Sequence, residues 1–198
     1  MKRILIIAVL LFASVSMFAQ KGYEKSVEIN GAVGLDDCQK YTFGISMING
    51  YRISESLFVG AGVGYEYLEG LYYHSYEYKG SIIGSTSYDS IDVRNNIQLF
   101  GRVKFNLIKS KISPFLTADA GYTIGLSSNE IKMANGFFFQ PSFGCDFKID
   151  DVQSVYVMLG YNGQNYTYRW FDNTLGSTDD KMITKLAGKF CLHIGFKF

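Results

Sequence analysis

The chain has 198 residues, with 19 basic and 18 acidic side chains and a formal net charge of +1, so a single domain is expected and no basic footprint for nucleic acid exists. Aromatic residues make up 16% of the chain, and it has 21 glycines but only two prolines, a composition that favours long strands over helices. Without Lys2 and Arg3 the acidic residues outnumber the basic ones by one, which also excludes a polybasic face for an anionic lipid surface.

The first 19 residues follow the three-part plan of a secretory signal peptide. Lys2 and Arg3 supply the positive charge, residues 4–13 form an uncharged apolar run, and residues 14–19 end on Ala19, a small residue suited to cleavage before Gln20. The apolar run is shorter than the about 20 residues that a membrane-spanning helix needs, which disfavours a permanent anchor. We predict a signal peptide at 1–19, with the exact cleavage position left open, and one mature domain at 20–198.

Strict alternation of apolar and polar residues recurs along the whole mature chain. In the most regular stretch, Ile97, Leu99 and Val103 share one phase, while Gln98 and Arg102 share the other. Such alternation is typical of strands with one apolar face. The predicted strands lie at 27–33, 41–53, 57–67, 91–107, 116–124, 137–149, 155–161 and 186–198.

Three details qualify this pattern. Ile48 and Asn49 interrupt the alternation of the second strand. Pro141 removes a ladder hydrogen bond from the sixth, so a bulge or a nearby strand end is expected there. Cys145 and Cys191 fall on opposite faces, and with three cysteines in an exported chain we expect no disulfide.

The predicted connections alternate in length. Those at 54–56, 108–113 and 150–154 are short, those at 68–90 and 170–183 are long, and those at 36–39 and 127–135 are intermediate. An even number of strands with tight turns at one end and longer loops at the other is the plan of an outer-membrane barrel, with the turns in the periplasm and the loops outside. Both ends of the mature chain are then expected on the periplasmic side.

The apolar phase is expected to face lipid, not the barrel interior. It is crowded with Phe, Tyr, Leu and Ile, and eight strands enclose an interior only just wide enough for side chains, so a secreted barrel with an apolar lumen cannot hold them all. Within the predicted strands the apolar phase carries no charged residue, and Lys25 lies ahead of the first strand, where an interface is expected. A basic residue at the middle of the bilayer costs about 2–4 kcal/mol, which explains this absence. The expected fold is all-β, an eight-stranded antiparallel up-and-down transmembrane β-barrel.

The end of the chain resembles the C-terminal insertion signal of bacterial outer-membrane barrels, which the barrel-assembly machinery recognises. It alternates strictly and stops on an aromatic residue, with Leu192, Ile194, Phe196 and Phe198 in the apolar phase. The whole mature chain resembles the small barrels of the OmpX and OmpA-transmembrane-domain type, and the stretch at 49–52 followed by 57–67 is similar to porin-like outer-membrane proteins of Bacteroidetes. This resemblance implies integral outer-membrane localisation and contact with outer-membrane lipid, but it specifies no activity.

A polar network is predicted in the lumen. It is either a channel or ion site, or a plug of paired charges, and we favour the plug because buried charges persist only when they are paired and porin-like conduction needs a wider barrel. The predicted lumen residues are Glu28, Arg52, Glu66, Asp92, Arg94, Arg102, Lys104, Asp119, Asp146, Lys148, Lys185 and Lys189.

Enzymatic activity is not expected. Enzymes of the barrel type that this chain resembles use a histidine with Ser or Asp near the outer rim, to process lipid acyl chains or to cut peptides. His193 lies near the expected periplasmic side, and His74, beside Ser75 in the long second connection, is more simply an exposed loop histidine. No metal-ligand spacing appears, so we predict neither catalytic residues, nor a metal, nor a cofactor. A lipid-modifying enzyme and a narrow channel for small solutes remain the alternatives.

The outer loops are the preferred functional candidates. Tyrosine-rich stretches lie at 71–78 and 166–171, where aromatic residues form either an interfacial girdle or a contact surface for an extracellular protein or glycan. The third and fourth strands are also able to protrude and recruit partner strands. We predict a non-enzymatic, monomeric barrel whose loops mediate surface interaction or envelope integrity. The candidate contact residues are Tyr72, Tyr73, His74, Tyr76 and Tyr78.

Overall fold

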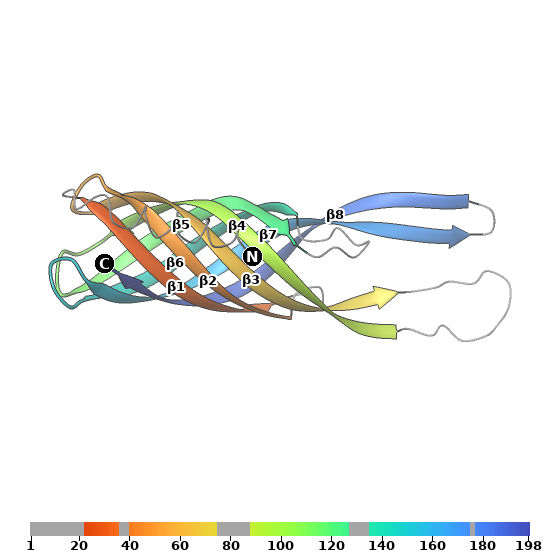
Figure 1. Cartoon of the computed structure of the whole chain (residues 1–198), viewed down its shortest axis with the longest axis horizontal. Helices are drawn as coiled ribbons and strands as arrows, with labels where there is room; N and C mark the ends of the chain where they lie inside the picture. Colours follow the sequence, from red (N-terminus) through yellow and green to blue (C-terminus); the bar gives the residue numbers. More distant parts are fainter. Residues whose placement is uncertain (1–21, 36–39, 75–87, 127–134, 175–176) are drawn as a thin grey trace, which may run out of the picture.

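The computed structural model describes residues 22–35, 40–74, 88–126, 135–174 and 177–198, with side chains for all of these except 70–74, 88–94, 166–174, 177–183 and 185. The chain forms a closed antiparallel barrel in which each strand pairs with its neighbours in sequence (Figure 1). The predicted all-β, up-and-down fold is confirmed. The strands are β1 (Tyr23–Gly34), β2 (Tyr41–Arg52), β3 (Leu57–His74), β4 (Tyr88–Asn106), β5 (Ile112–Gly125), β6 (Gly136–Lys148), β7 (Ser154–Thr174) and β8 (Ser177–Lys197). Within the described ranges, no helix is long and apolar enough to cross a membrane.

The first and last strands close the barrel. Val27 lies opposite Phe196 and Ile29 lies opposite Ile194, in antiparallel register. Lys25 and Phe198 exchange backbone hydrogen bonds of 3.2 and 2.9 Å, so the last residue of the chain is still held by β1. Pairing of β1 with both β2 and β8 leaves no open sheet edge in the barrel wall, which is the condition for a sheet to cross lipid.

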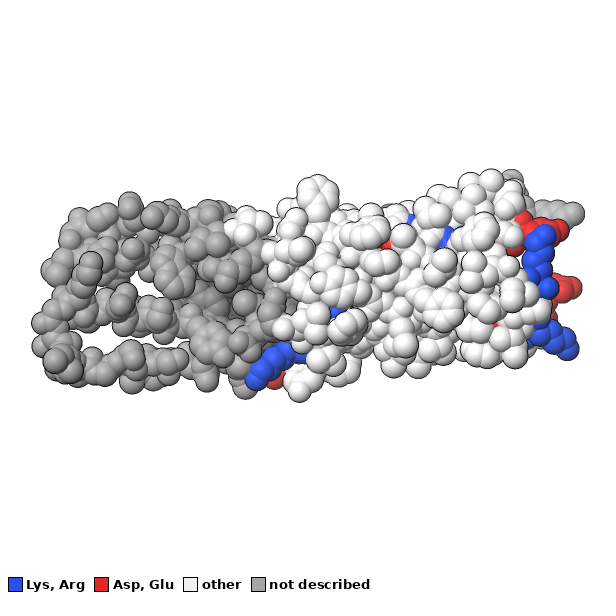
Figure 2. All heavy atoms as spheres, turned by 180° about the vertical axis from the view of Figure 1, so that it is seen from behind, with Lys and Arg blue, Asp and Glu red and all other residues white. Residues whose placement is uncertain are grey.

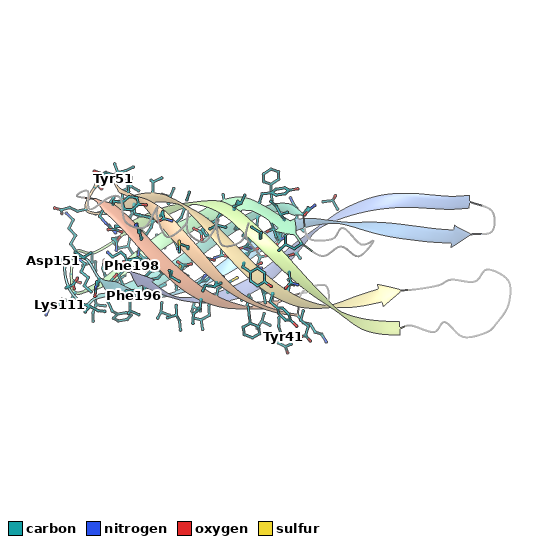
Figure 3. The ribbon with its side chains drawn as sticks, in the orientation of Figure 1. Tyr41, Tyr51, Lys111, Asp151, Phe196 and Phe198 are labelled. Carbon is teal, nitrogen blue, oxygen red and sulfur yellow. The ribbon has the colours of Figure 1, made fainter. Side chains whose placement is uncertain are left out.

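The two phases of each strand occupy opposite faces of the wall, as predicted. Phe43, Leu159 and Phe137, all in the apolar phase, are 64%, 64% and 70% exposed on the outside. Figure 2 shows that the wall is almost uncharged on the face in view, while Lys, Arg, Asp and Glu gather at the end that carries the short turns. Tyr41 and Tyr51 point outward from opposite ends of β2 (Figure 3). This surface is suited to a bilayer with aromatic residues near both interfaces.

Two hairpins extend well beyond the barrel wall (Figure 1). The β3–β4 ladder continues to the pair His74 and Tyr88, although β2 leaves β3 at Glu69. The β7–β8 ladder likewise continues to Thr174 and Ser177. The predicted connections at 68–90 and 170–183 were therefore too long, and the stretch at 166–171 belongs to a strand. We name these extensions the β3–β4 ribbon (70–74 with 88–92) and the β7–β8 ribbon (166–174 with 177–185).

Pro141 lies inside β6 without a bulge. The β6–β7 register pairs Phe139 with Gly163, omits Gln140 and Pro141, and resumes in the same frame at Ser142 and Gly160. The missing backbone N–H of proline thus leaves a local gap in the ladder, so the expectation of a bulge or a strand end was wrong. Ile48 and Asn49 also keep their register, with Ile48 turned inward and buried.

The interior contains large aromatic rings, which the predicted glycine-rich polar phase did not anticipate. Phe58, Phe100, Phe115 and Tyr156 are all buried inside. Each ring lies over an inward-facing glycine: a Cβ on Gly60 would come within 2.7 Å of the Phe58 ring, one on Gly62 within 2.4 Å of Phe100, one on Gly144 within 2.5 Å of Phe115, and one on Gly195 within 2.2 Å of Tyr156. The inward glycines therefore make room for neighbouring rings in a narrow barrel.

The short turns are held by side chains. Asp150 accepts backbone hydrogen bonds of 2.8 and 2.6 Å from Val152 and Gln153, and these bonds lower the pKa of its carboxyl group. Lys109 in the β4–β5 turn forms an ion pair with Glu55 in the β2–β3 turn. Cys145 and Cys191 are free thiols, as expected, and Cys38 lies outside the described residues.

Candidate functional site in the barrel interior

A bidentate ion pair lies near the middle of the interior. Arg102 on β4 donates from Nε and Nη2 to the two carboxylate oxygens of Asp119, its neighbour on β5, at 2.7 and 2.6 Å. The same guanidinium donates from Nη1 and Nη2 to Glu28 on β1, a strand that does not adjoin β4. Arg102 and both carboxylates are almost completely buried. One guanidinium thus joins separate parts of the wall across the lumen, with the fork geometry that favours arginine.

Glu28 extends this cluster toward the other side of the barrel. The Tyr156 hydroxyl donates to Glu28 Oε1 at 2.5 Å, and His193 Nδ1 lies 3.4 Å from Oε2. On its other side the His193 ring lies against Gln140, with 2.9 Å between the two Nε2 atoms, and Asn162 Nδ2 donates to Gln140 Oε1 at 3.0 Å. We call these connected residues the central network: Glu28, Arg102, Asp119, Gln140, Tyr156, Asn162 and His193.

A second group, the mouth network, lies toward the short turns. Lys104 Nζ is 2.7 Å from Asp146 Oδ2 and also lies over two rings, 3.8 Å from the centroid of Phe115 and 4.7 Å from that of Tyr156. An ammonium held over ring faces in this way gains cation–π stabilisation. The remaining links run from Asn106 to Asp146 and Ser113, from Arg52 to Asn106, and from Arg52 and Lys197 to Glu24.

A third group, the Glu66–Lys189 pair, lies toward the ribbons. Lys189 Nζ on β8 donates to both carboxylate oxygens of Glu66 on β3, at 3.0 and 3.1 Å, although these strands are not neighbours. Both side chains are buried. This pair spans the lumen with one cation for one anion.

Apolar side chains occupy the space between the polar groups. Ile48, Phe58, Phe100 and Phe138 form one buried cluster, in which the rings of Phe100 and Phe138 meet edge to face with centroids 6.2 Å apart. Phe115, Tyr156 and Met158 form a second cluster. A pocket lined by Arg102, Lys104 and Thr117, among others, has a volume of about 20 Å³, which is room for one water molecule.

The predicted lumen residues are distributed unevenly. The structure places Glu28, Glu66, Arg102, Lys104, Asp119, Asp146 and Lys189 in the interior, and Arg52 half-buried at the mouth. Lys148 was assigned wrongly: it is exposed, because it is the last residue of β6 and reaches past the rim. Lys25, expected at the lipid interface, is instead buried and lines the pocket. The side chains of Asp92, Arg94 and Lys185 lie outside the described ones.

Several interior residues escaped the sequence-based selection. Tyr156, His193, Gln140 and Asn162 all share the inward phase, but the selection considered only Asp, Glu, Lys and Arg. The alternation itself was therefore the available signal, applied to polar and aromatic residues as well as charged ones. Within the part of the chain that the structure describes, no group of three or more His, Cys, Asp or Glu side chains is arranged to hold a metal ion.

The other predicted sites lie at the two ends of the molecule. Leu192, Ile194, Phe196 and Phe198 are exposed on the outer face, and the rings of Phe196 and Phe198 stack with centroids 6.0 Å apart near the short turns (Figure 3). Tyr72, Tyr73 and His74 belong by their backbone to β3, but their side chains lie outside the described ones. Tyr76 and Tyr78 lie outside the described residues altogether.

Comparisons with known proteins identify the fold. No protein-family model matches the chain, and the comparison with curated proteins found no match. The crystal structure of OprG from Pseudomonas aeruginosa superposes with a TM-score of 0.62 at 12% identity, over 90% of this chain and 97% of that one. Neisserial surface protein A (NspA) gives 0.56 at 14% identity, over 89% and 96% of the two chains. The solid-state NMR structure of AlkL in DMPC bilayers gives 0.52 at 11% identity, over 92% of each. The chain has the fold of the small eight-stranded outer-membrane β-barrels.

Proposed function

We propose that this protein is an integral, non-enzymatic outer-membrane barrel with a plugged interior, and that its two ribbons contact an extracellular protein or glycan or contribute to envelope integrity. The short turns and both ends of the mature barrel then face the periplasm, and the ribbons face outward. The chain acts as a monomer surrounded by outer-membrane lipid.

The ribbons carry this proposal. Beyond Glu69 the described residues of β3 pair only with β4, and beyond Gln164 those of β7 pair only with β8. The outer edges of both ribbons therefore present rows of backbone N–H and C=O groups without a strand beside them in the described chain. Such edges can add an extended segment of another protein through main-chain hydrogen bonds. Ribbons that project beyond the apolar wall are placed to meet a partner at the cell surface.

The packing of the interior argues against a conducting pore. Three groups of paired charges cross the lumen, and the aromatic clusters fill the space between them. Breaking such paired groups to open a water-filled path leaves buried charges without partners, which is costly. Planar-bilayer recordings of the purified barrel are expected to show no reproducible open level; a stable single-channel conductance would overturn the plug.

The experiment that tests the surface role compares cells carrying the full chain with cells carrying a barrel in which each ribbon is replaced by a two-residue turn at the barrel rim. Adhesion to plates coated with protein or glycan is expected to fall, while heat-modifiable migration in outer-membrane fractions is retained. A shortened 127–134 connection serves as the matched control. Equal adhesion by all three proteins, on every coating, would refute the surface role but not the membrane location. An unshifted band confined to the soluble periplasm would refute the location itself.

The terminal strand is proposed to direct assembly by the barrel machinery. Its outward residues Ile194 and Phe196 are already held by β1 and β7, so removal of Phe198 leaves most of the β8 pairing intact. Deletion of Phe198 is expected to lower the amount of heat-modifiable protein in the outer membrane, with Leu159→Ala on the same face as a control. Normal insertion of the shortened chain would contradict this role.

A second candidate function is a narrow passage for small solutes. It is favoured by buried polar atoms among the described side chains that lack a protein partner, including Asn96 Oδ1, Gln98 Nε2 and Thr123 Oγ1. Such atoms favour water in the ribbon-side half of the lumen. The bilayer recording described above distinguishes this function from a plug.

A further inference from the structure

The β7–β8 ribbon continues the alternation of the barrel wall. Its register runs without interruption from the short-turn end of the barrel to the pair Thr174 and Ser177, so residues two positions apart lie on the same face throughout. Asn162 and Gln164, on the even-numbered positions of β7, are buried in the lumen. The even-numbered positions of β7 beyond Gln164 therefore lie on the face of the ribbon that continues the lumen-facing wall. We call this the inner face.

The inner face carries a row of aromatic residues. Tyr166, Tyr168 and Trp170 occupy alternate positions of β7, and a rise of about 3.4 Å per residue spaces these positions about 7 Å apart. Their register partners on β8 share the same face and are, in the same order, Lys185, Ile183 and Lys181. We call these six residues the inner-face ladder.

An interfacial girdle does not account for this row. Girdle residues belong to the outward phase of a barrel, because that phase meets the lipid headgroups. On β7 the outward phase is the odd-numbered one, in which Tyr161 is exposed. In the ribbon this phase holds Thr167, Arg169 and Phe171, of which one is aromatic. The aromatic row is on the opposite face, so contact with lipid headgroups does not explain it.

The neighbouring barrel strands end before the ladder begins. β6 pairs with β7 no further than Gln164, and β1 pairs with β8 no further than Lys189. The ribbon then projects as a two-stranded arm (Figure 1). Among the described residues no third strand flanks the ladder, so a ligand outside the barrel can lie along it.

Aromatic residues in a line suit a polymer of sugar rings. One face of a sugar ring presents C–H groups that stack on an aromatic ring, while its edge carries hydroxyl groups. Tyrosine and tryptophan combine a large apolar ring with a polar group able to hydrogen bond, so they suit both parts of a sugar. Three aromatic positions spaced about 7 Å apart along an extended strand match an extended polymer better than a compact ligand.

The charges on the same face favour an acidic polymer. Lys181 and Lys185 both come from β8, so positive charge lies along one side of the aromatic row. The acidic pair of this face, Asp172 and Asp179, is nearer the tip, about 20 Å from the Lys185 position. That separation exceeds the screening length of about 8 Å at physiological salt, so the acidic pair does not cancel the charge of Lys185.

We propose that the inner face of the β7–β8 ribbon binds an acidic polysaccharide, with sugar rings stacked along Tyr166, Tyr168 and Trp170 and an acidic group of the polymer paired with Lys185. This inference rests on the proposed surface role and narrows its partner to an acidic glycan. A protein strand that adds to the ribbon edge pairs with backbone groups and does not distinguish the two faces. Binding that depends on the inner face alone therefore identifies the glycan site.

The fluorescence of Trp170 tests the ladder directly, because the chain has a single tryptophan. The full chain in lipid nanodiscs is titrated with two acidic polysaccharides, polygalacturonate and chondroitin sulfate, and with the neutral polysaccharide dextran. At least one acidic polymer is expected to shift the Trp170 emission in a saturable manner, while dextran leaves it unchanged. A titration in which neither acidic polymer shifts the emission, or in which dextran shifts it equally, would overturn the proposal.

Matched substitutions on the two faces separate the ladder from the general surface role. Tyr168→Ala on the inner face is expected to weaken binding of the acidic polymer about tenfold, the scale of one lost stacking contact. Phe171→Ala on the outer face should leave binding unchanged, and Lys185→Gln should weaken it and reduce its dependence on salt. Heat-modifiable migration checks that each variant folds.

Two results of this comparison would refute the ladder. One is equal binding by Tyr168→Ala and Phe171→Ala, and the other is undiminished binding by Lys185→Gln. If cells still needed the ribbons to adhere to protein coatings, the proposed surface role would survive either result. The failure of the glycan site is thereby distinguished from the failure of the surface role.

Discussion

The two faces of the barrel wall are built from the same strands but follow different rules. On the outside, Leu99, Val103 and their neighbours are exposed side by side, and any apolar residue that suits lipid meets the requirement. On the inside, Arg102 lies between Leu99 and Val103 in sequence order, yet it has defined partners on two other strands. The outer face is specified by chemical class, whereas the inner face is specified residue by residue.

This difference arises from the surroundings of each face. Lipid is a uniform solvent for apolar groups, so an outward substitution changes little beyond the buried area. The interior of an eight-stranded barrel is only as wide as its side chains, so each inward residue must fit the one opposite and each charge must meet its counterion. Substitutions at matched positions on the two faces should therefore differ strongly in their effect on the free energy of unfolding.

The largest effect is expected for Arg102→Met. The change leaves Glu28 and Asp119 buried without their shared cation, and removing one partner of a buried ion pair costs about 3–5 kcal/mol. Urea unfolding in detergent or lipid vesicles measures this loss. Val103→Met, one residue away on the outer face, is the matched control and is expected to unfold close to the original protein. Equal midpoints for the two variants would contradict the contrast between the faces.

The Glu66–Lys189 pair allows a sharper test, because its charges balance one for one. Lys189→Met alone is expected to destabilise the barrel by about 3 kcal/mol, since it leaves the Glu66 carboxylate buried and unpaired. The double variant Lys189→Met, Glu66→Leu removes both charges and should recover most of the lost stability, because well-packed apolar residues often replace a buried ion pair without cost. A double variant as unstable as the single one would mean that the pair supplies more than charge compensation.

Glycine-to-alanine substitutions on the two faces are expected to change stability less, and they differ only in which face receives the added methyl group. A Cβ on Gly62 would lie 2.4 Å from the Phe100 ring, whereas one on Gly101 would have its nearest neighbour at 3.9 Å. Gly62→Ala is therefore expected to cost about 1–3 kcal/mol through overpacking. Gly101→Ala should be neutral or stabilising by up to about 1 kcal/mol, since alanine loses less backbone entropy than glycine. The unfolding midpoints of the two variants check this, and a reversed order would contradict the close packing inside.

The sequence predicted the strands well where the barrel wall faces lipid and poorly where the strands extend beyond it. Where the wall faces lipid, the apolar phase is continuous, and the alternation located all eight strands and assigned the outer face. In the ribbons neither face needs to be apolar, so the period-two signal fades. The predicted seventh strand accordingly ended at Tyr161, although β7 continues to Thr174. The largest errors in strand ends, in β3, β7 and β8, are at the ends that leave the barrel wall, whereas β1 and β5 begin only a few residues before their predicted starts.

The sequence could predict which residues face the interior, but not which of them contact each other. The phase correctly turned Glu28, Arg102 and Lys189 inward. It could not pair Glu28 on β1 with Arg102 on β4, because that contact depends on the stagger of the strands around the closed barrel. Selection by charge also omitted His193, which contacts Gln140 and Glu28 in the central network.

The smallest effect is expected for the exposed Glu55–Lys109 pair. Lys109 lowers the pKa of the Glu55 carboxyl group, and a lowered pKa contributes stability that is present at neutral pH and lost as the pH falls through the folded-state value. Both side chains are exposed in the turns, however, and water and salt screen such a pair almost completely. Lys109→Ala should therefore leave the urea midpoint unchanged at 0.15 M salt, in contrast to Arg102→Met. A clearly lower urea midpoint for Lys109→Ala that returns to normal at 1 M salt would show that ion pairs between the short turns stabilise the barrel. Specific charge pairing would then matter at the exposed rim as well as in the interior.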